Sequence, residues 1–216
     1  MVYNHLMHGA ITCSEPSARQ GGSSHSRAQA PHTTTQHRRP NKQNIELNQR
    51  IQSITNIQEL CDLIRSSSAE LNHVNIATAL RKVLQAPRRG VSPEVVVNAL
   101  KTLEESALQQ MQDFGPQETA NTLHIMAKQR HNPSQAHLMA LERRAEEISG
   151  EFNSQHVANT LWAFATMGRK PGERLMGQLE GRAEAISGEF NSQHVANTLW
   201  AFATMGTRPE IGRAHV

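Results

Sequence analysis

One group of polar side chains recurs in this sequence at a fixed spacing of i, i+3 and i+4, which places its three members on one face of a helix. The triplets are Glu118, Asn121 and Thr122; His156, Asn159 and Thr160; and His194, Asn197 and Thr198. Their carboxylate, imidazole, amide and hydroxyl groups can hydrogen-bond to the edges of unstacked bases, so we take them as candidate RNA contacts. Alternatively, the asparagines bridge neighbouring repeats through backbone hydrogen bonds, or the triplets simply face water.

A second column of residues follows the same spacing at the rim of that face: Arg81, His124, Trp162 and Trp200. Each of these side chains has a flat face that can stack on a base. The alternative is that the tryptophans fill the core, with the histidine and the arginine at a looser boundary.

Two basic clusters could contact phosphates. They comprise Arg81, Lys82, Arg88 and Arg89, and the smaller pair Arg169 and Lys170. Inter-helix loops of a repeat array lie along one edge, where phosphate contact is plausible. Otherwise these residues are solvated charges.

Residue patterns typical of an enzyme are missing from the sequence. There is no histidine pair at i, i+4, no phosphate-binding glycine loop, no nucleophile elbow and no convincing acid-base pair. Cys13 and Cys61 lie far apart and match no metal-ligand spacing, which favours a reducing compartment. We therefore expect a non-enzymatic protein with no cofactor and no metal, and the lack of a long apolar run predicts no membrane span.

Self-similarity is the main evidence for the fold. Residues 144–168 and 182–206 are identical except for Glu147 and Ala185, which gives a repeat of 38 residues. Degenerate copies begin at Phe114 and, 43 residues earlier, at Leu71. The sequence predicts an all-α solenoid of helix-turn-helix repeats with a period of about 38 residues, spanning 44–210. Its expected units lie near 71–113, 114–151, 152–189 and 190–210, the last of them incomplete.

Each unit is expected to contain two helices. In the third unit, Ser154 is a plausible N-cap and Gly168 a stop, which predicts a first helix over about 155–167. The second helix restarts after Pro171, carries apolar residues at helical spacing and ends near Gly188. Ser92-Pro93 and Pro133-Ser134 begin the corresponding second helices upstream. Ile57, Leu60, Cys61 and Ile64 mark a further helix that could cap the array.

The first helix has a broad apolar arc made of Val157, Ala158, Leu161, Trp162, Phe164 and Ala165. The opposite arc holds Gln155, His156, Asn159, Thr160, Ala163 and Thr166. One helix pair cannot cover so wide an apolar arc, and stacking on the adjacent pair can.

Both ends of the chain differ from the repeats. Residues 1–43 are rich in Ser, Thr, His, Gln and Pro and carry a net charge of +4, whereas residues 44–216 carry −1. The first segment is expected to be a disordered tail; it suits a transit peptide, although a solvated linker is the alternative. Residues 211–216 match what a common short-read sequencing adapter encodes, so we suspect a sequencing artefact and expect a natural protein that continues further.

The segment Ala158–Ala165, repeated at 196–203, resembles the octotricopeptide repeats of algal organelle proteins. These repeats are similar to those of FAST-kinase-like and RAP-domain proteins of mitochondria and plastids. The upstream segment 71–80 resembles the first repeat of such arrays. The resemblance covers about 55–210 and is most specific in 152–168 and 190–206.

This resemblance implies a helical solenoid that binds single-stranded organelle RNA and acts in its processing, stability or translation. It also implies a location in a mitochondrion or chloroplast and possible protein partners in an organellar ribonucleoprotein. The alternative is a protein-binding scaffold of the armadillo or tetratricopeptide type, which uses the same architecture. Near-neutral charge in 44–216 favours the scaffold, whereas the resemblance and the planar column favour RNA.

Overall fold

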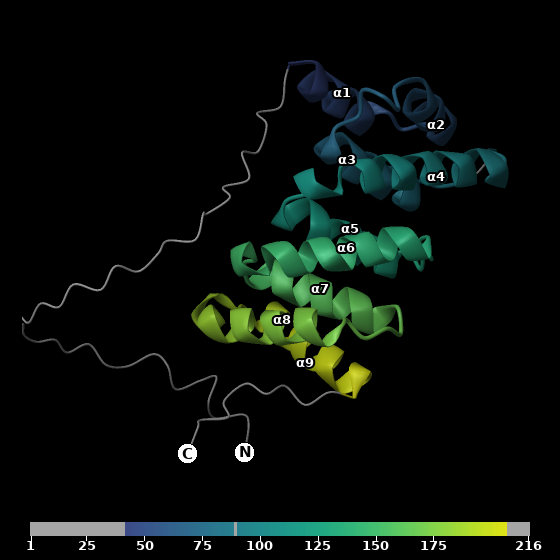
Figure 1. The fold of residues 1–216 in the computed structure, drawn as a ribbon. Coiled ribbons are helices and arrows are strands. Elements are labelled where there is room, and N and C mark those ends of the chain that lie inside the picture. Colours follow the sequence, from purple (N-terminus) through teal and green to yellow (C-terminus); the bar gives the residue numbers. More distant parts are fainter. Residues whose placement is uncertain (1–41, 89, 207–216) are drawn as a thin grey trace, which may run out of the picture. The chain divides into compact units, whose positions relative to one another are not determined.

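The computed structural model describes residues 42–88 and 90–206, and within these ranges the chain forms nine α-helices, three short 3-10 helices and no strand (Figure 1). The α-helices are α1 (Lys42–Ser53), α2 (Ile57–Ser66), α3 (His73–Gln85), α4 (Pro93–Gln109), α5 (Pro116–Lys128), α6 (Gln135–Ile148), α7 (Ser154–Thr166), α8 (Glu173–Ala185) and α9 (Ser192–Met205). The predicted tail up to residue 41 and the segment 207–216, which includes the suspected artefact, lie outside the described residues.

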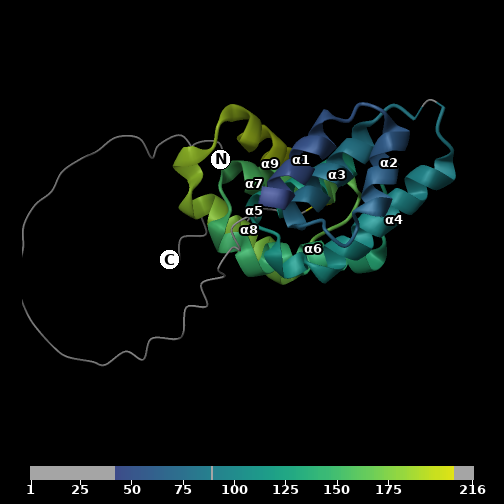
Figure 2. The ribbon, with the colours of Figure 1, turned by 90° about the horizontal axis from the view of Figure 1, so that it is seen from above.

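The helices form two layers. In the A layer, α1, α3, α5, α7 and α9 pack each on the next, and in the B layer α2, α4, α6 and α8 do the same (Figures 1 and 2). The A-layer helices α5, α7 and α9 pack far more extensively on one another than the B-layer helices do.

Helices α5, α7 and α9 begin at residues 116, 154 and 192, and α3 begins at residue 73. Each A-layer helix from α1 to α7 is followed by a B-layer helix, so the stretches beginning at Phe114 and Phe152 occupy equivalent, successive places. The predicted all-α helical repeat array is confirmed. The pair α1 and α2 extends the array upstream; the helix marked by Ile57 to Ile64 was predicted, and α1 was not.

The start of α7 differs from the prediction by one residue. The N-cap is Asn153, whose side-chain oxygen accepts from the backbone N–H of His156 at 2.9 Å. Ser154 is instead the first helical residue, and its Oγ donates to the carbonyl of Glu189, the last residue before the next unit, at 3.0 Å. Asparagine and serine are comparable caps, and here the serine is buried in the contact between repeats.

The end of α7 follows the prediction. Gly168 has φ +66°, and the N–H of Arg169 after it donates to the carbonyl of Phe164 at 3.0 Å. A left-handed residue with this bond is a common helix stop that glycine adopts without strain. One unit earlier the same position holds Arg130, with φ +52°.

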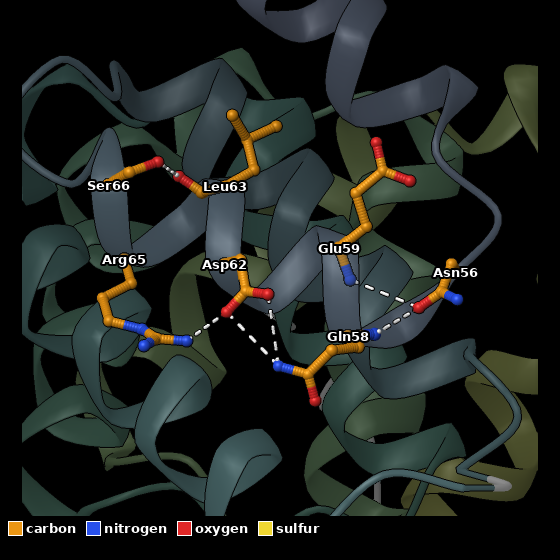
Figure 3. Close-up of polar contacts among 7 residues, drawn as sticks. All are labelled: Asn56, Gln58, Glu59, Asp62, Leu63, Arg65 and Ser66. Carbon is orange, nitrogen blue, oxygen red and sulfur yellow. Dashed lines mark hydrogen bonds and ion pairs between the residues drawn. The ribbon is translucent and has the colours of Figure 1, made fainter.

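Helix α2, which belongs to the helix pair at the start of the array, has a capped N-terminus and an exposed polar face (Figure 3). The side-chain oxygen of Asn56 accepts from the backbone N–H groups of Gln58 and Glu59, and the exposed Asp62 accepts from Gln58 and Arg65. The opposite face buries the four residues that predicted this helix: Ile57, Leu60, Cys61 and Ile64. Burial raises the pKa of the Cys61 thiol, which keeps it protonated and makes it a core residue.

Consecutive B-layer helices are joined by a repeated polar contact. Glu104 of α4 accepts from the backbone N–H of Ser134, the N-cap of α6, at 3.0 Å. One period later, Glu142 of α6 accepts from the N–H of Gly172, the N-cap of α8, at 2.5 Å. A carboxylate at a helix N-terminus also interacts favourably with the helix dipole, so each unit helps to orient the next.

Candidate nucleic-acid interface

The A-layer helices present the same row of residues to the outside, at positions i, i+4, i+7 and i+11 of one helix face. We call it the A-layer stripe; it comprises Gln117, Asn121, His124 and Lys128 on α5, Gln155, Asn159, Trp162 and Thr166 on α7, and Gln193, Asn197, Trp200 and Thr204 on α9. Every one of these residues is exposed or half-buried, whereas the residues between them are mostly buried.

The rings of the stripe fix the register between helices. The ring centroids of His124 and Trp162 are 4.8 Å apart, and those of Trp162 and Trp200 are 6.3 Å apart, with interplanar angles of 35° in both pairs. Equivalent residues of α5, α7 and α9 are therefore neighbours, and the three helices run in the same direction.

This contact bears on the predicted stacking column. Because the three rings pack against one another, they leave no gap for a base to insert between them. Trp200 is 47% exposed, so it offers the most open ring surface of the three. Arg81, the fourth member of the column, is exposed on α3. Base stacking stays a prediction, and the open ring surface of Trp200 together with Arg81 is the place for it.

The asparagines of the stripe are available for hydrogen bonding. Within the described residues, the side-chain amides of Asn121, Asn159 and Asn197 have no hydrogen-bond partner. The alternative, in which these asparagines bridge neighbouring repeats through hydrogen bonds, is therefore not observed in this part of the chain. Each amide carries two donors and an acceptor at the surface.

The glutamines of the stripe, Gln117, Gln155 and Gln193, are exposed one helical turn before each asparagine. The helical pattern of the sequence places Gln155 on the polar arc, but these glutamines were not among the predicted contacts. The i−4 spacing from each asparagine was the signal that could have found them.

The threonines of the predicted triplets lie elsewhere. Thr122, Thr160 and Thr198 are buried between adjacent A-layer helices, as is Ala163, although the helical wheel puts Thr160 and Ala163 on the polar arc. Close helix packing covers both flanks of α7, so only the stripe itself reaches solvent. We therefore leave these three threonines out of the proposed contact set.

The first members of the triplets occupy the N-terminal turn of each A-layer helix. Glu118 accepts from the backbone N–H of Gly115 at 3.2 Å, and His156 Nδ1 accepts from the N–H of Asn153 at 3.3 Å. His194 lies edge-on to Phe190, as His156 does to Phe152. Glu118 and His156 thus cap their helices, and all three residues are half-buried at one end of the stripe.

Two histidines near the stripe are held in the neutral form. Burial lowers the pKa of His156, and the opposing effect of the nearby Glu118 carboxylate is smaller. Burial also lowers the pKa of His124, and the charge of Lys128 adds to this effect. At neutral pH the stripe therefore presents donors, acceptors and rings, and Lys128 is its one charged member.

The predicted phosphate contacts divide into engaged and open side chains. Lys82 Nζ donates to the carbonyls of Gln52 and Ile54, both at 2.6 Å, and so closes the end of α1. Arg169 is exposed and donates to Gln135 at 3.1 Å. Three members are exposed without such a contact within the described residues, namely Arg81, Arg88 and Lys170, whereas Arg89 lies outside them.

Two further cations lie at the C-terminal ends of the A-layer helices. Lys128 and Arg130 are exposed at the end of α5, at the same edge of the layer as Arg169 and Lys170 at the end of α7. Lys128 and Arg130 were not among the predicted phosphate contacts, because neither is adjacent to another cation in the sequence. We call Arg81, Lys128, Arg130, Arg169 and Lys170 the basic edge.

In residues 42–88 and 90–206, no group of three or more His, Cys, Asp or Glu side chains could hold a metal ion. No helix in this part of the chain is long and apolar enough to cross a membrane.

Comparison with known proteins gives one family. A search of curated proteins found no match. The profile of the RNA-editing substrate-binding complex 6 (RESC6) proteins matches residues 98–212, slightly more than half of the chain, and covers α5 to α9 with their stripe. This chain therefore belongs to the RNA-editing substrate-binding complex 6 (RESC6) family.

Proposed function

We propose that this protein is a non-catalytic RNA-binding repeat protein that holds a single-stranded transcript along its A layer during RNA processing. The observation that carries the proposal is the stripe: an exposed carboxamide pair and a flat ring recur in register on three neighbouring helices. Carboxamides can bond to the base edges that single strands leave open, and flat side chains can stack on bases.

The arrangement also supplies a place for the backbone. The basic edge lies at the C-terminal ends of α5 and α7 and at Arg81 on α3, so phosphates can lie there while the bases reach the carboxamides. The cations are few and spread out, so the interface relies on base contacts more than a strongly basic protein does.

The family name supports a role within an assembly. RESC6 proteins are named as members of an RNA-editing substrate-binding complex. We accordingly propose that this chain works with protein partners in such an RNA-processing complex and leaves the chemistry to other subunits. The octotricopeptide type of its repeats stays a proposal that rests on the sequence resemblance.

A location in a mitochondrion or chloroplast is likewise proposed from the composition of the first 43 residues and from the resemblance. A fluorescent fusion at the C-terminus of the whole chain, imaged with organelle markers, tests it. Residence in the cytosol or nucleus would contradict the proposal.

The direct test of RNA binding uses the full chain and a mixed-sequence single-stranded RNA over a range of salt concentrations. Wild-type affinity should fall with salt, because phosphate contacts release counterions. The triple variant N121A/N159A/N197A should bind about a hundredfold more weakly, since each of the three lost base contacts costs about 1 kcal/mol. The basic tail is present in both proteins, so it cannot account for a difference between them.

A matched control is Asn98→Ala, which removes an exposed asparagine from α4 in the B layer. It should leave RNA affinity unchanged. Equal affinity of the wild type and the triple variant would refute the role of the stripe, and no binding even at low salt would refute the function.

The second candidate function is a protein-binding scaffold. It is favoured by the near-neutral charge of residues 44–216 and by the exposed apolar side chains Leu199 and Trp200 on α9. The absence of RNA binding at low salt, together with a stable complex with a protein partner, would put this function first.

A further inference from the structure

We infer that the surfaces of α7 and α9 select the same base at two neighbouring nucleotides of the bound strand. This inference rests on the proposed RNA-binding function and adds its specificity. It is carried by the identity of the parts of the A-layer stripe on α7 and α9, called here the α7 and α9 stripes, and by their register.

The two stripes have the same chemistry. Gln155, Asn159, Trp162 and Thr166 on α7 correspond residue by residue to Gln193, Asn197, Trp200 and Thr204 on α9. The identity extends from residue 182 through 206 with the single exception of Ala185, which lies in α8 and outside the A layer. The other residues of the two helices are therefore the same in sequence as well.

The two stripes also adopt the same local geometry. Asn153 and Asn191 cap their helices by the same bond, each accepting from the N–H of the histidine three residues on, at 2.9 Å. Gly168 and Gly206 end the helices with φ +66° and +64°. Equivalent side chains therefore start from the same backbone positions on both helices.

The stripes are immediate neighbours. The Trp162 and Trp200 rings are 6.3 Å apart, and α7 and α9 pack along their length. In helical-repeat readers of single-stranded RNA, one repeat takes one base, so adjacent stripes face adjacent nucleotides. Two identical sets of donors and acceptors must then prefer the same base.

The chemistry of selection lies in the carboxamides. A side-chain amide presents a donor beside an acceptor and can form a pair of hydrogen bonds with a base edge of complementary pattern. Gln155 with Asn159, and Gln193 with Asn197, each give two such groups at one stripe. Helix α5 carries the same pair in Gln117 and Asn121 but has His124 and Lys128 in place of Trp and Thr, so its contacts differ in ring and charge.

The experiment uses the full chain and short RNAs in which only two neighbouring positions carry a base, flanked by abasic nucleotides. All combinations of the four bases at these two positions are compared at low salt. The flanks keep the phosphates but provide no base, so the position of the doublet along the protein need not be known in advance.

The tightest doublet should be one with two identical bases, and each mixed doublet containing that base should bind at least about fivefold more weakly. A mixed doublet that binds tightest, or equal binding of all doublets, would overturn the inference while RNA of full sequence still binds. Failure of fully based RNA to bind would instead defeat the proposed function.

Single-residue variants sharpen the test. Asn159→Ala should abolish the preference at one position of the doublet and Asn197→Ala at the other. Each variant should then bind the best identical doublet and the mixed doublets that differ at its own position alike, and should still discriminate at the other position. Asn121→Ala, on α5, should leave the difference between identical and mixed doublets intact. If N121A removed the preference and N159A did not, the assignment to α7 and α9 would be wrong.

Discussion

The guanidinium of Arg144, near the end of α6, donates from Nε to the backbone carbonyl oxygen of Phe114 at 2.8 Å. The same bond recurs one period later, where Arg182 of α8 donates to the carbonyl of Phe152 at 2.7 Å. In the preceding unit Gln110 donates to the carbonyl of Leu71, also at 2.7 Å. Each acceptor stands just before the N-cap of an A-layer helix, so each unit is closed by one side chain from the end of its B-layer helix.

Removal of this bond should destabilise the array. Arg144 is almost fully buried, and Arg144→Ala leaves the buried carbonyl of Phe114 without its donor, which should cost about 2 kcal/mol in the free energy of unfolding. The exposed neighbour Arg143, which pairs only with Glu147, is the control, and Arg143→Ala should cost less than about 0.5 kcal/mol. Urea unfolding followed by circular dichroism measures both, and equal losses would contradict the role of the bond.

The difference between the two near-identical repeats falls beside this bond. Glu147 pairs with Arg144 at 3.2 Å, and its counterpart is Ala185, so Arg182 lacks an acidic neighbour at i+3. Ala185→Glu should restore the pair and raise the free energy of unfolding by only about 0.3–0.5 kcal/mol, because the site is exposed. The gain should shrink in high salt; a gain independent of salt would point to another cause.

The buried threonines of the A layer predict a gain in stability. The Oγ1 atoms of Thr122, Thr160 and Thr198 are buried and have no hydrogen-bond partner within the described residues. Thr160→Val keeps the shape and removes the unsatisfied hydroxyl, so the free energy of unfolding should rise by about 1 kcal/mol. The exposed Thr166→Val is the control and should change stability by less than about 0.5 kcal/mol. A destabilised T160V would show that the hydroxyl is bonded in solution.

Acid stability should depend on Glu104. Burial raises the pKa of this carboxyl, but the hydrogen bonds with His131 and the backbone N–H of Ser134, together with the His137 ring 3.9 Å away, outweigh that effect and hold the pKa well below its usual range. A folded pKa below the unfolded one gives stability that is complete above the unfolded value of about 4.3 and is lost as the pH falls further. Wild-type melting temperature should drop below this pH, and Glu104→Gln should flatten that part of the profile; an unchanged slope in E104Q would exclude Glu104 as its source.

Much of the fold follows from the sequence, because repetition and apolar spacing are properties of the chain itself. Ser92-Pro93 and Pro133-Ser134 do begin α4 and α6, and Gly168 does end α7. The cap at α7 was misplaced by one residue, because Asn153 and Ser154 are chemically equivalent choices and only the backbone decides between them.

The candidate site was predictable in part. The asparagines and the ring column were found, since their spacing marks an exposed helix face. The burial of Thr160 was not, because a single-helix wheel cannot show that both neighbouring helices cover its flanks. The contact between the rings of Trp162 and Trp200 is also a property of the packed array, and the sequence gives no sign of it.

Arg130 separates folding from RNA binding in one substitution. Its φ of +52° is a left-handed conformation that costs a non-glycine residue about 1 kcal/mol, and the equivalent residues Gly168 and Gly206 adopt it without strain. Arg130→Gly should therefore raise the free energy of unfolding by about 0.5–1 kcal/mol. It also removes a cation from the basic edge, so RNA affinity should fall and its salt dependence should become shallower by about one counterion. Unfolding curves and salt-titrated RNA binding of the same preparation test both effects. Because a more stable variant cannot bind weakly through damage to its fold, a loss of RNA affinity would come from the lost charge. Undiminished RNA affinity in the more stable variant would remove Arg130 from the interface.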